Sequence, residues 1–153
     1  MEWSLKKFHE LTLDELYAIL KLRSNVFIVE QNCVYNDLDG KDELAWHLMG
    51  TENKNLIAYT RILPSGIVYP EPAIGRVVIS PSKRKTGLGR EIMKRSIDQC
   101  ARLFGDTPVT LSAQAYLKKF YESFGFIAHG DEYFDDGILH IEMTRKAPRK
   151  NTA

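Results

Sequence analysis

The segment AIGRVVISPSKRKTGLGREIMKRSIDQC, residues 73–100, decides the fold of this chain of 153 residues. It begins with AIGRVVIS, whose β-branched residues predict a strand. A glycine-containing turn follows at once. Beyond the turn, Leu88, Ile92, Ile97 and Cys100 recur at spacings of three to five residues, which places most of them on one face of a helix. The segment therefore predicts a strand, a tight turn and a helix in direct succession.

The turn between this strand and this helix has the properties of an anion-binding site. Backbone N–H groups at the start of a helix lack partners, and they point with the helix dipole at whatever lies in the turn. Gly87 and Gly89 allow a phosphate to approach the backbone closely. Basic residues add the positive charge that a pyrophosphate requires, and these are Lys83, Arg84, Lys85 and Arg90. A solvated basic turn is the alternative for each feature alone, and their combination favours the anion site.

Two other kinds of phosphate loop fit these residues poorly. A Walker loop needs Gly-Lys-Ser or Gly-Lys-Thr, whereas Gly89 is followed by Arg90 and Glu91. A dinucleotide-binding fingerprint needs a third glycine where the helix packs closely on the strand, and Ile92 stands there. The turn therefore belongs to neither class.

The chain before this segment predicts a strand, a polar loop and a hairpin. Residues 3–8, WSLKKF, are a candidate first strand. Residues 34–43, VYNDLDGKDE, are polar and rich in turn formers, which predicts a surface loop. Residues 45–50 and 56–63 are short apolar runs joined by a turn-forming sequence, as in a β-hairpin.

A first helix is predicted between the first strand and the polar loop. Thr12 and Glu15 have the spacing of a capping box, which marks the start of a helix. An apolar stripe follows at helical spacing, and it comprises Leu13, Leu16, Leu20 and Phe27. The two signals together predict a helix with an apolar stripe.

The chain beyond Gly105, which ends the second helix, predicts a strand, a short helix and two closing strands. These are VTLSA at residues 109–113, LKKFYES at 117–123, and FIAHG and ILHIEMT at 126–130 and 138–144. The complete order fits an α+β fold with three layers, in which a mixed, mostly antiparallel sheet carries helices on both faces.

Length and composition predict one cytoplasmic domain. With 153 residues, the chain can bury one core, and we expect a single domain over residues 1–146 and a disordered tail over residues 147–153. No apolar run is long enough to span a bilayer, and no signal peptide begins the chain. The 21 basic and 20 acidic residues leave a formal charge of +1, so no overall field attracts polyanions. Cys33 and Cys100 form no metal-binding or redox motif, and no metal is expected.

Three stretches resemble the GNAT acyltransferase family, in the right order. Arg84 to Gly89, RKTGLG, resembles the family's Q/R-x-x-G-x-G/A signature after a strand. Residues 112–126, SAQAYLKKFYESFGF, are similar to its FYxxxGF element. The stretches LKLRSNVFIVEQ and YNDLDGKDE, at residues 20–31 and 35–43, resemble the ElaA-like branch more specifically. The resemblance covers nearly the whole chain.

This resemblance implies an acetyl-CoA-dependent N-acetyltransferase. The sheet should splay into an acyl-CoA cleft beside the strand of residues 73–80, where the pantetheine arm pairs with the strand edge. One backbone N–H of that edge would polarise the thioester carbonyl, and a primary amine would attack it directly. Tyr121 corresponds to the family's general acid, with packing in the core as the alternative. The implied donor-binding residues are Val77, Val78, Ile79, Arg84, Lys85, Thr86, Gly87, Leu88, Gly89, Arg90 and Gln114.

The sequence departs from the family pattern at two positions. Many members place a glutamate on the strand before the loop, and this chain has Arg76-Val77-Val78-Ile79 there, which leaves the general base unassigned. The candidates are Glu30, Asp37, Asp39 and His47. The structural alternatives are an ion pair of Glu30 with Arg23 and a half-buried strand position for His47, and each is favoured over catalysis. Gln114 stands where an asparagine is frequent.

The partner expected for this chain is a small-molecule or peptide amine. The acidic loop of residues 36–43 would attract a cationic amine, although most acidic loops are simply solvated. A non-catalytic acyl-CoA sensor or a nucleic-acid binder is the alternative function, but nucleic-acid binding gives no reason for the FYESFGF element. A membrane partner is not expected, and a homodimer is compatible with the sequence.

Overall fold

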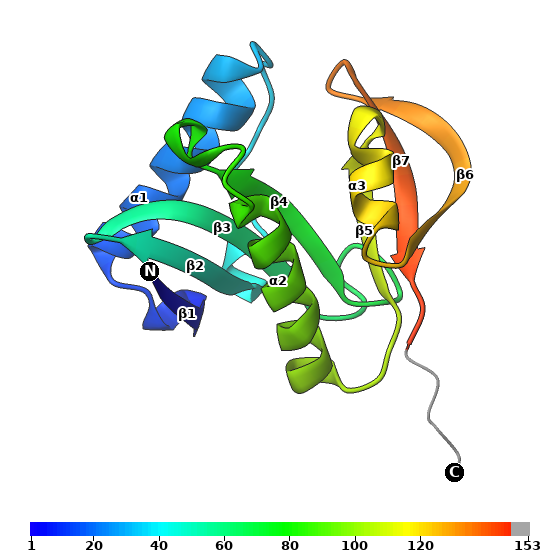
Figure 1. Ribbon diagram of the computed structural model, residues 1–153, viewed down its shortest axis with the longest axis horizontal. Helices are drawn as coiled ribbons and strands as arrows, with labels where there is room; N and C mark the ends of the chain where they lie inside the picture. The colour runs from blue at the N-terminus through cyan, green and yellow to red at the C-terminus, as the bar shows by residue number, and fades with distance from the viewer. Residues whose placement is uncertain (148–153) are drawn as a thin grey trace.

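The computed structural model describes residues 1–147, so most of the predicted tail, residues 148–153, lies outside the described residues. The described chain forms a seven-stranded sheet in the order β1-β2-β3-β4-β5-β7-β6 (Figure 1). The strands are β1 (Glu2–Lys7), β2 (Trp46–Glu52), β3 (Asn55–Leu63), β4 (Ala73–Ile79), β5 (Val109–Gln114), β6 (Phe126–Asp135) and β7 (Ile138–Arg145). The longer helices are α1 (Leu13–Arg23), which continues as the π-helix η2 (Ser24–Glu30), α2 (Leu88–Phe104) and α3 (Lys118–Glu122).

The sheet splits between β4 and β5. Every pair of neighbouring strands is antiparallel except β4 and β5, which run parallel and are paired only at Ala73 and Thr110. Beyond this pair β4 and β5 diverge, as Figure 1 shows. We call this divergence the split. It leaves one edge of β4 without a neighbouring strand over most of its length, so the predicted mixed sheet that splays beside β4 is confirmed.

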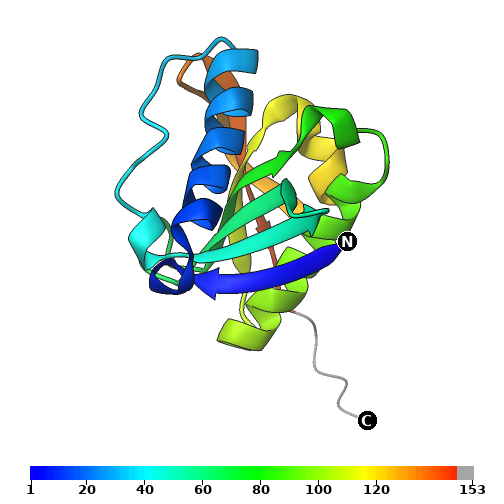
Figure 2. The ribbon, with the colours of Figure 1, turned by 90° about the vertical axis from the view of Figure 1, so that its left-hand side faces the viewer.

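Helices cover both faces of the sheet, as predicted. Ile19 and Leu22 of α1 pack on Met49 and Tyr59, whereas Ile92 of α2 packs on the alternate sheet residues, Leu48 and Ala58. Because successive strand residues point to opposite faces, α1 and α2 must lie on opposite sides of the sheet. Figure 2 shows this arrangement, with α1 on one side of the sheet and α2 and α3 on the other.

The start of α1 is confirmed, and its most deeply buried residues are not those of the apolar stripe named from the sequence. The Thr12 side chain accepts a hydrogen bond from the N–H of Glu15, and the Glu15 carboxylate accepts one from the N–H of Thr12. Leu13 is 85% exposed, and the buried positions are instead Ile19, Leu22, Arg23 and Val26. The region contains two apolar sets at helical spacing, so periodicity alone could not choose between them.

The predicted turns and closing strands are confirmed. The hairpin turn between β2 and β3 places Asn53 and Lys54 at φ of 51° and 65°, and the turn between β6 and β7 has Asp136 and Gly137 at 48° and 80°. Turns with positive φ at both central residues match the twist of the strands that they join. α2 ends before Gly105, whose positive φ of 78° is a conformation that glycine adopts readily.

Candidate functional site

The turn between β4 and α2 has its glycine where the backbone requires one. Gly87 is the N-cap of α2 and has a φ of 85°, while a Cβ there would meet no neighbouring atom within 4 Å. A glycine is therefore required at position 87 by the backbone conformation and not by a lack of space for a side chain. Gly89 lies in the first turn of α2, where a Cβ would lie 3.9 Å from the Phe120 ring, an ordinary contact. Thr86 stabilises the turn because its hydroxyl donates to the Lys83 carbonyl at 2.6 Å.

The basic residues of this turn lie at the surface in weak ion pairs. Arg84 Nη1 lies 2.6 Å from Glu30 Oε1, and Lys83 Nζ lies 3.0 Å from Glu52 Oε1. Exposed pairs of this kind contribute about 0–1 kcal/mol, so an anion can replace the carboxylate at little cost. Lys85 is exposed, at a φ of 64°. These side chains are therefore free to turn toward a bound phosphate.

Arg90 joins the start of α2 to the segment after α3. Its Nη1 donates to Ser123 Oγ at 3.2 Å, and its guanidinium lies 4.9 Å from the centre of the Phe124 ring. The buried Leu88 anchors the same turn of α2 in the core beneath β2 and β3. The N-terminus of α2 is thus held in place from both sides of the split.

The open edge of β4 presents alternate backbone groups. The N–H of Ser80 donates to the carbonyl of Ile57 on β3, and Val78 pairs with Tyr59 two residues earlier. Alternation along a strand therefore turns the N–H and C=O of Val78 toward β3. The same alternation turns those of Val77 and Ile79 toward the split. Of the three predicted strand residues, these two present main-chain groups to a ligand there.

Tyr121, on α3, combines a buried ring with a hydroxyl that is not fully buried. Only 6% of the residue is exposed, and its ring packs edge-on against Phe120 and Phe126. Within residues 1–147 the hydroxyl makes no hydrogen bond, and its oxygen is not fully buried. Burial, with a smaller contribution from Tyr116, raises the pKa of Tyr121 to about 12. The phenol is therefore protonated at neutral pH and can donate a proton.

Two contacts bridge the far end of the split. Gln114, at the end of β5, points its amide Nε2 at Gln31 Oε1 at a distance of 3.5 Å. Cys33 Sγ donates to the backbone carbonyl of Asp136, in the turn between β6 and β7, at 3.1 Å. Gln114 therefore lies where β5 approaches the chain that follows α1. Cys100, in contrast, is in the core, where burial raises the pKa of its thiol to about 12.

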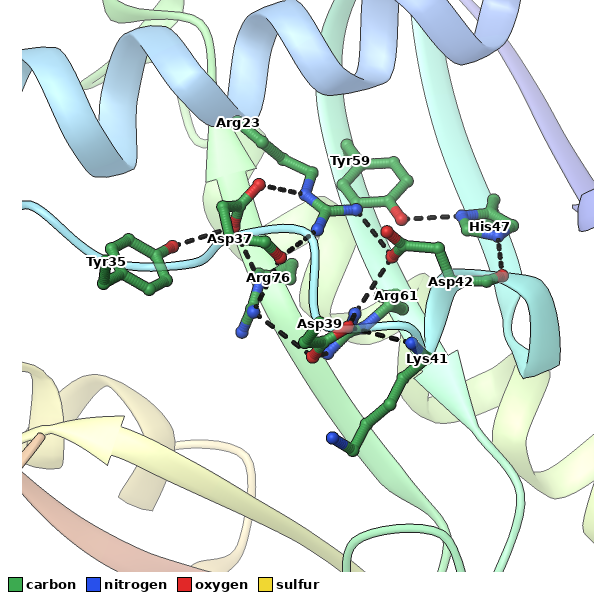
Figure 3. A network of polar contacts seen from close by, with 10 residues as sticks. All are labelled: Arg23, Tyr35, Asp37, Asp39, Lys41, Asp42, His47, Tyr59, Arg61 and Arg76. Atoms are coloured by element: carbon green, nitrogen blue, oxygen red, sulfur yellow. Dashed lines mark hydrogen bonds and ion pairs between the residues drawn. The ribbon is translucent and has the colours of Figure 1, made fainter.

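A closed ring of alternating charges lies beside β4, and Figure 3 shows it. Each arginine pairs with two aspartates and each aspartate with two arginines, at N–O distances of 2.7–3.3 Å. In order around the ring, the residues are Arg23, Asp37, Arg76, Asp39, Arg61 and Asp42. We call this set the charge ring. Three positive and three negative side chains leave it without net charge.

Pairing with arginine keeps Asp39 and Asp42 of the charge ring ionised despite their burial. Arg23 is completely buried and Asp37 is 2% exposed. Burial alone would raise the pKa of Asp39 and Asp42, but hydrogen bonds and positive charge from the arginines hold both pKa values below their usual range. The Nε of Arg61 is buried without a hydrogen-bond partner among the described residues. Removing one partner of such a buried ion pair strongly destabilises the folded protein, because the other charge stays buried and unpaired.

The charge ring corrects the prediction of an acidic surface loop. Asp37 and Asp42 are buried, and the carboxylates of residues 37, 39 and 42 are already neutralised by arginine. The predicted ion pair between Arg23 and Glu30 is also wrong, because Arg23 pairs with Asp37 and Asp42 within the charge ring. Sequence reasoning missed the ring, although one signal was present: Arg61 and Arg76 each stand within an apolar strand, where a buried charge needs a partner.

The candidate bases are held in other contacts. His47 is completely buried, not half-buried as predicted. Its Nε2 lies 2.9 Å from the Asp42 carbonyl, which can only accept, so Nε2 carries the proton and Nδ1 accepts from the Tyr59 hydroxyl at 2.6 Å. Burial lowers the pKa of His47. Asp37 accepts from the Tyr35 hydroxyl at 2.8 Å in addition to its arginines.

Comparison with known proteins decides the family. The Acetyltransferase (GNAT) domain family matches residues 21–147. This chain belongs to the GNAT acetyltransferase family. It is 43% identical to protein ElaA of Escherichia coli K12 over 148 residues, which cover 95% of this chain and 97% of that protein. The predicted membership of the family, and the resemblance to its ElaA-like branch, are confirmed.

Solved structures agree with this assignment to the GNAT family. An acyl-CoA N-acyltransferase from Pseudomonas aeruginosa superposes with a TM-score of 0.90 at 44% identity, covering 95% of this chain and 99% of that one. Escherichia coli ElaA superposes with a TM-score of 0.89 at 43% identity and the same coverage. An aminoglycoside 6'-N-acetyltransferase complexed with coenzyme A shares the fold at 14% identity, with a TM-score of 0.72 and coverage of 97% and 99%. This GNAT chain has, within residues 1–147, no helix long and apolar enough to cross a membrane.

Proposed function

We propose that this GNAT domain transfers an acetyl group from acetyl-CoA to a primary amine of a small molecule or peptide. The observation that carries the proposal is the hydroxyl of the buried Tyr121, which has no hydrogen-bond partner among residues 1–147 and is not fully buried. The free edge of β4 and the anion-binding turn at Gly87 supply the other two elements that an acyl-CoA donor requires. Membership of the GNAT family and the coenzyme A bound to a protein of the same fold support the choice of donor.

The donor would lie in the split with its pyrophosphate at the start of α2. Backbone N–H groups of Leu88 and Gly89 and the side chains of Arg84 and Lys85 would hold the phosphates. The pantetheine arm would pair with the edge of β4 as an added strand, with Val77 and Ile79 as its partners. This arrangement uses the backbone groups that face the split.

The reaction would then proceed by direct attack. The amine nitrogen forms a bond to the thioester carbonyl carbon, and the N–H of Val77 stabilises the negative charge that develops on the oxygen. The C–S bond breaks, and Tyr121 gives its proton to the leaving thiolate. Because a phenol with a pKa of about 12 is a weaker acid than a thiol of pKa about 8.5, the transfer requires the hydroxyl to be aimed at the sulfur. Tyr121 recovers its proton from water, and the amine loses one to water.

A panel of amines, incubated with acetyl-CoA while the released thiol is measured, tests the proposal. We expect thiol release that depends on both the amine and Tyr121. Acetyl-CoA should be preferred over donors with longer acyl chains, which are assayed in parallel. Tight CoA binding without thiol release from any amine would instead indicate a non-catalytic sensor.

The binding of nucleic acid is tested in the same preparation. The formal charge of +1 gives the protein no overall field that attracts polyanions, so we expect weak DNA binding even at low salt. Fractionation of cells tests the proposed cytoplasmic location, and sedimentation tests for a homodimer.

A further inference from the structure

Arg76 has an unusual backbone conformation in the middle of β4. Its φ is 49°, in the left-handed region that residues with a side chain rarely adopt. The pairing of β4 with β3 changes register at this point, from Arg61 opposite Gly75 to Tyr59 opposite Val78. One extra residue is therefore inserted into β4, which makes a β-bulge with Arg76 in the strained position.

This bulge decides which backbone groups face the split. If β4 continued without it in the register of Arg61 and Gly75, then Val77 would stand opposite Tyr59 and its N–H would turn toward β3. With the bulge, Val78 takes that place, and Val77 turns toward the split instead. The conformation of Arg76 thus directs the N–H of Val77 toward the split.

The charge ring holds the Arg76 side chain from two sides. Its Nε lies 2.9 Å from Asp37 Oδ1, at an angle unsuited to a hydrogen bond, so this contact is electrostatic. Its Nη2 donates to the Asp37 carbonyl at 3.1 Å and to Asp39 Oδ2 at 3.3 Å. Asp37 and Asp39 are in turn fixed by Arg23 on α1 and Arg61 on β3. The contacts that hold Arg76 therefore depend on residues of α1 and β3.

We propose that the charge ring is a positioning device for the active site: it keeps Arg76 in the left-handed conformation and thereby aims the N–H of Val77 at the thioester carbonyl. The inference rests on the proposed acyl transfer. Replacing buried ion pairs by apolar side chains is often neutral for stability, so the energy of the pairs alone does not explain a closed ring. A role in fixing the backbone explains the closed ring, because an N–H that stabilises the developing oxyanion must not move during the reaction.

The test compares Arg76→Ala with Arg76→Gly. Both variants lose the same charge and the same contacts, and each aspartate of the pair keeps another arginine, Arg23 or Arg61. Glycine adopts the left-handed region freely, whereas alanine does not. We expect kcat of the glycine variant to exceed that of the alanine variant by about 5- to 30-fold, with equal KM for the amine. Equal kcat values in two folded variants would refute the proposal.

A matched control uses Lys54, which has a φ of 65° in the hairpin turn between β2 and β3, outside the split. Lys54→Ala and Lys54→Gly should differ in melting temperature but not in kcat. A similar ratio of kcat between the glycine and alanine variants at positions 54 and 76 would mean that kcat reports general stability and not the direction of the Val77 N–H. That result would also overturn the inference.

Donor binding separates this inference from the proposed function. A hydrogen bond from Val77 to the thioester carbonyl exists with acetyl-CoA and is missing with free CoA, so the parent should prefer acetyl-CoA by about 2- to 12-fold in Kd. Arg76→Gly should keep this preference and Arg76→Ala should lose it, even if no amine is ever acetylated. Absence of the preference in the parent would overturn the positioning role. If Arg76→Ala does not fold, the single variant Asp39→Asn is compared with the double variant Asp39→Asn, Arg76→Gly. The single variant should lose the preference for acetyl-CoA, and the double variant should regain it.

Discussion

Replacing Tyr121 by phenylalanine removes the proposed proton donor and leaves the ring in place. Removing a buried hydroxyl usually leaves its partner without a hydrogen bond, at a cost of about 1–3 kcal/mol. The Tyr121 hydroxyl has no such partner in the part of the chain that the structure describes, and its oxygen is not fully buried. The free energy of unfolding should therefore change by less than about 0.5 kcal/mol.

Turnover should respond very differently. The loss of a general acid typically costs about 10²- to 10⁴-fold in rate, and the effect should lie in kcat, because proton donation stabilises the transition state and not the bound donor. Steady-state kinetics at saturating acetyl-CoA measure kcat, and calorimetry measures the Kd of CoA, which should be unchanged. Tyr116→Phe is the matched control, since Tyr116 is 76% exposed on the neighbouring turn.

The reasoning would be refuted if kcat of Tyr121→Phe stayed within a few-fold of the parent. It would also fail if stability and kcat fell together by similar free energies, because the tyrosine would then be a core residue. In either case water or another side chain protonates the thiolate.

Three further predictions concern the turn at Gly87, Arg84 and the pH dependence of stability. Gly87→Val should weaken CoA binding much more than Gly89→Ala, because only position 87 has a left-handed φ, and calorimetric Kd values check this. Arg84→Ala should weaken CoA binding by about 1–3 kcal/mol if its guanidinium binds phosphate, and an unchanged Kd would remove it from the site. His47 has a lowered pKa in the folded state, so its contribution to stability is complete above its unfolded pKa of 6.5 and is lost as the pH falls below that value. The lowered pKa of Asp39 adds a second loss as the pH falls below its unfolded value of 3.8, and a stability curve without these two phases would contradict both assignments.

The strand, turn and helix of residues 73–104 could be predicted because their signals are local. β-branched residues favour an extended backbone, Gly87 permits the left-handed turn, and Gly105 ends the helix. The buried face of α1 could not be predicted, because two apolar sets at helical spacing, one with Leu13 and one with Ile19, compete for it. Only contact with the sheet decides between them.

The sequence by itself determined the order of the elements, the anion-binding turn at Gly87 and the position of Tyr121 on its short helix. Each of these depends on backbone preferences that act over a few residues. The tertiary structure alone decided the charge ring and which backbone groups of β4 face the split. Arg61 and Arg76 meet aspartates that lie 19 to 39 residues away in the chain, and the direction of the Val77 N–H follows from the register of two strands. Such pairings arise only when the folded chain brings distant charges into a buried site, where none can remain unpaired.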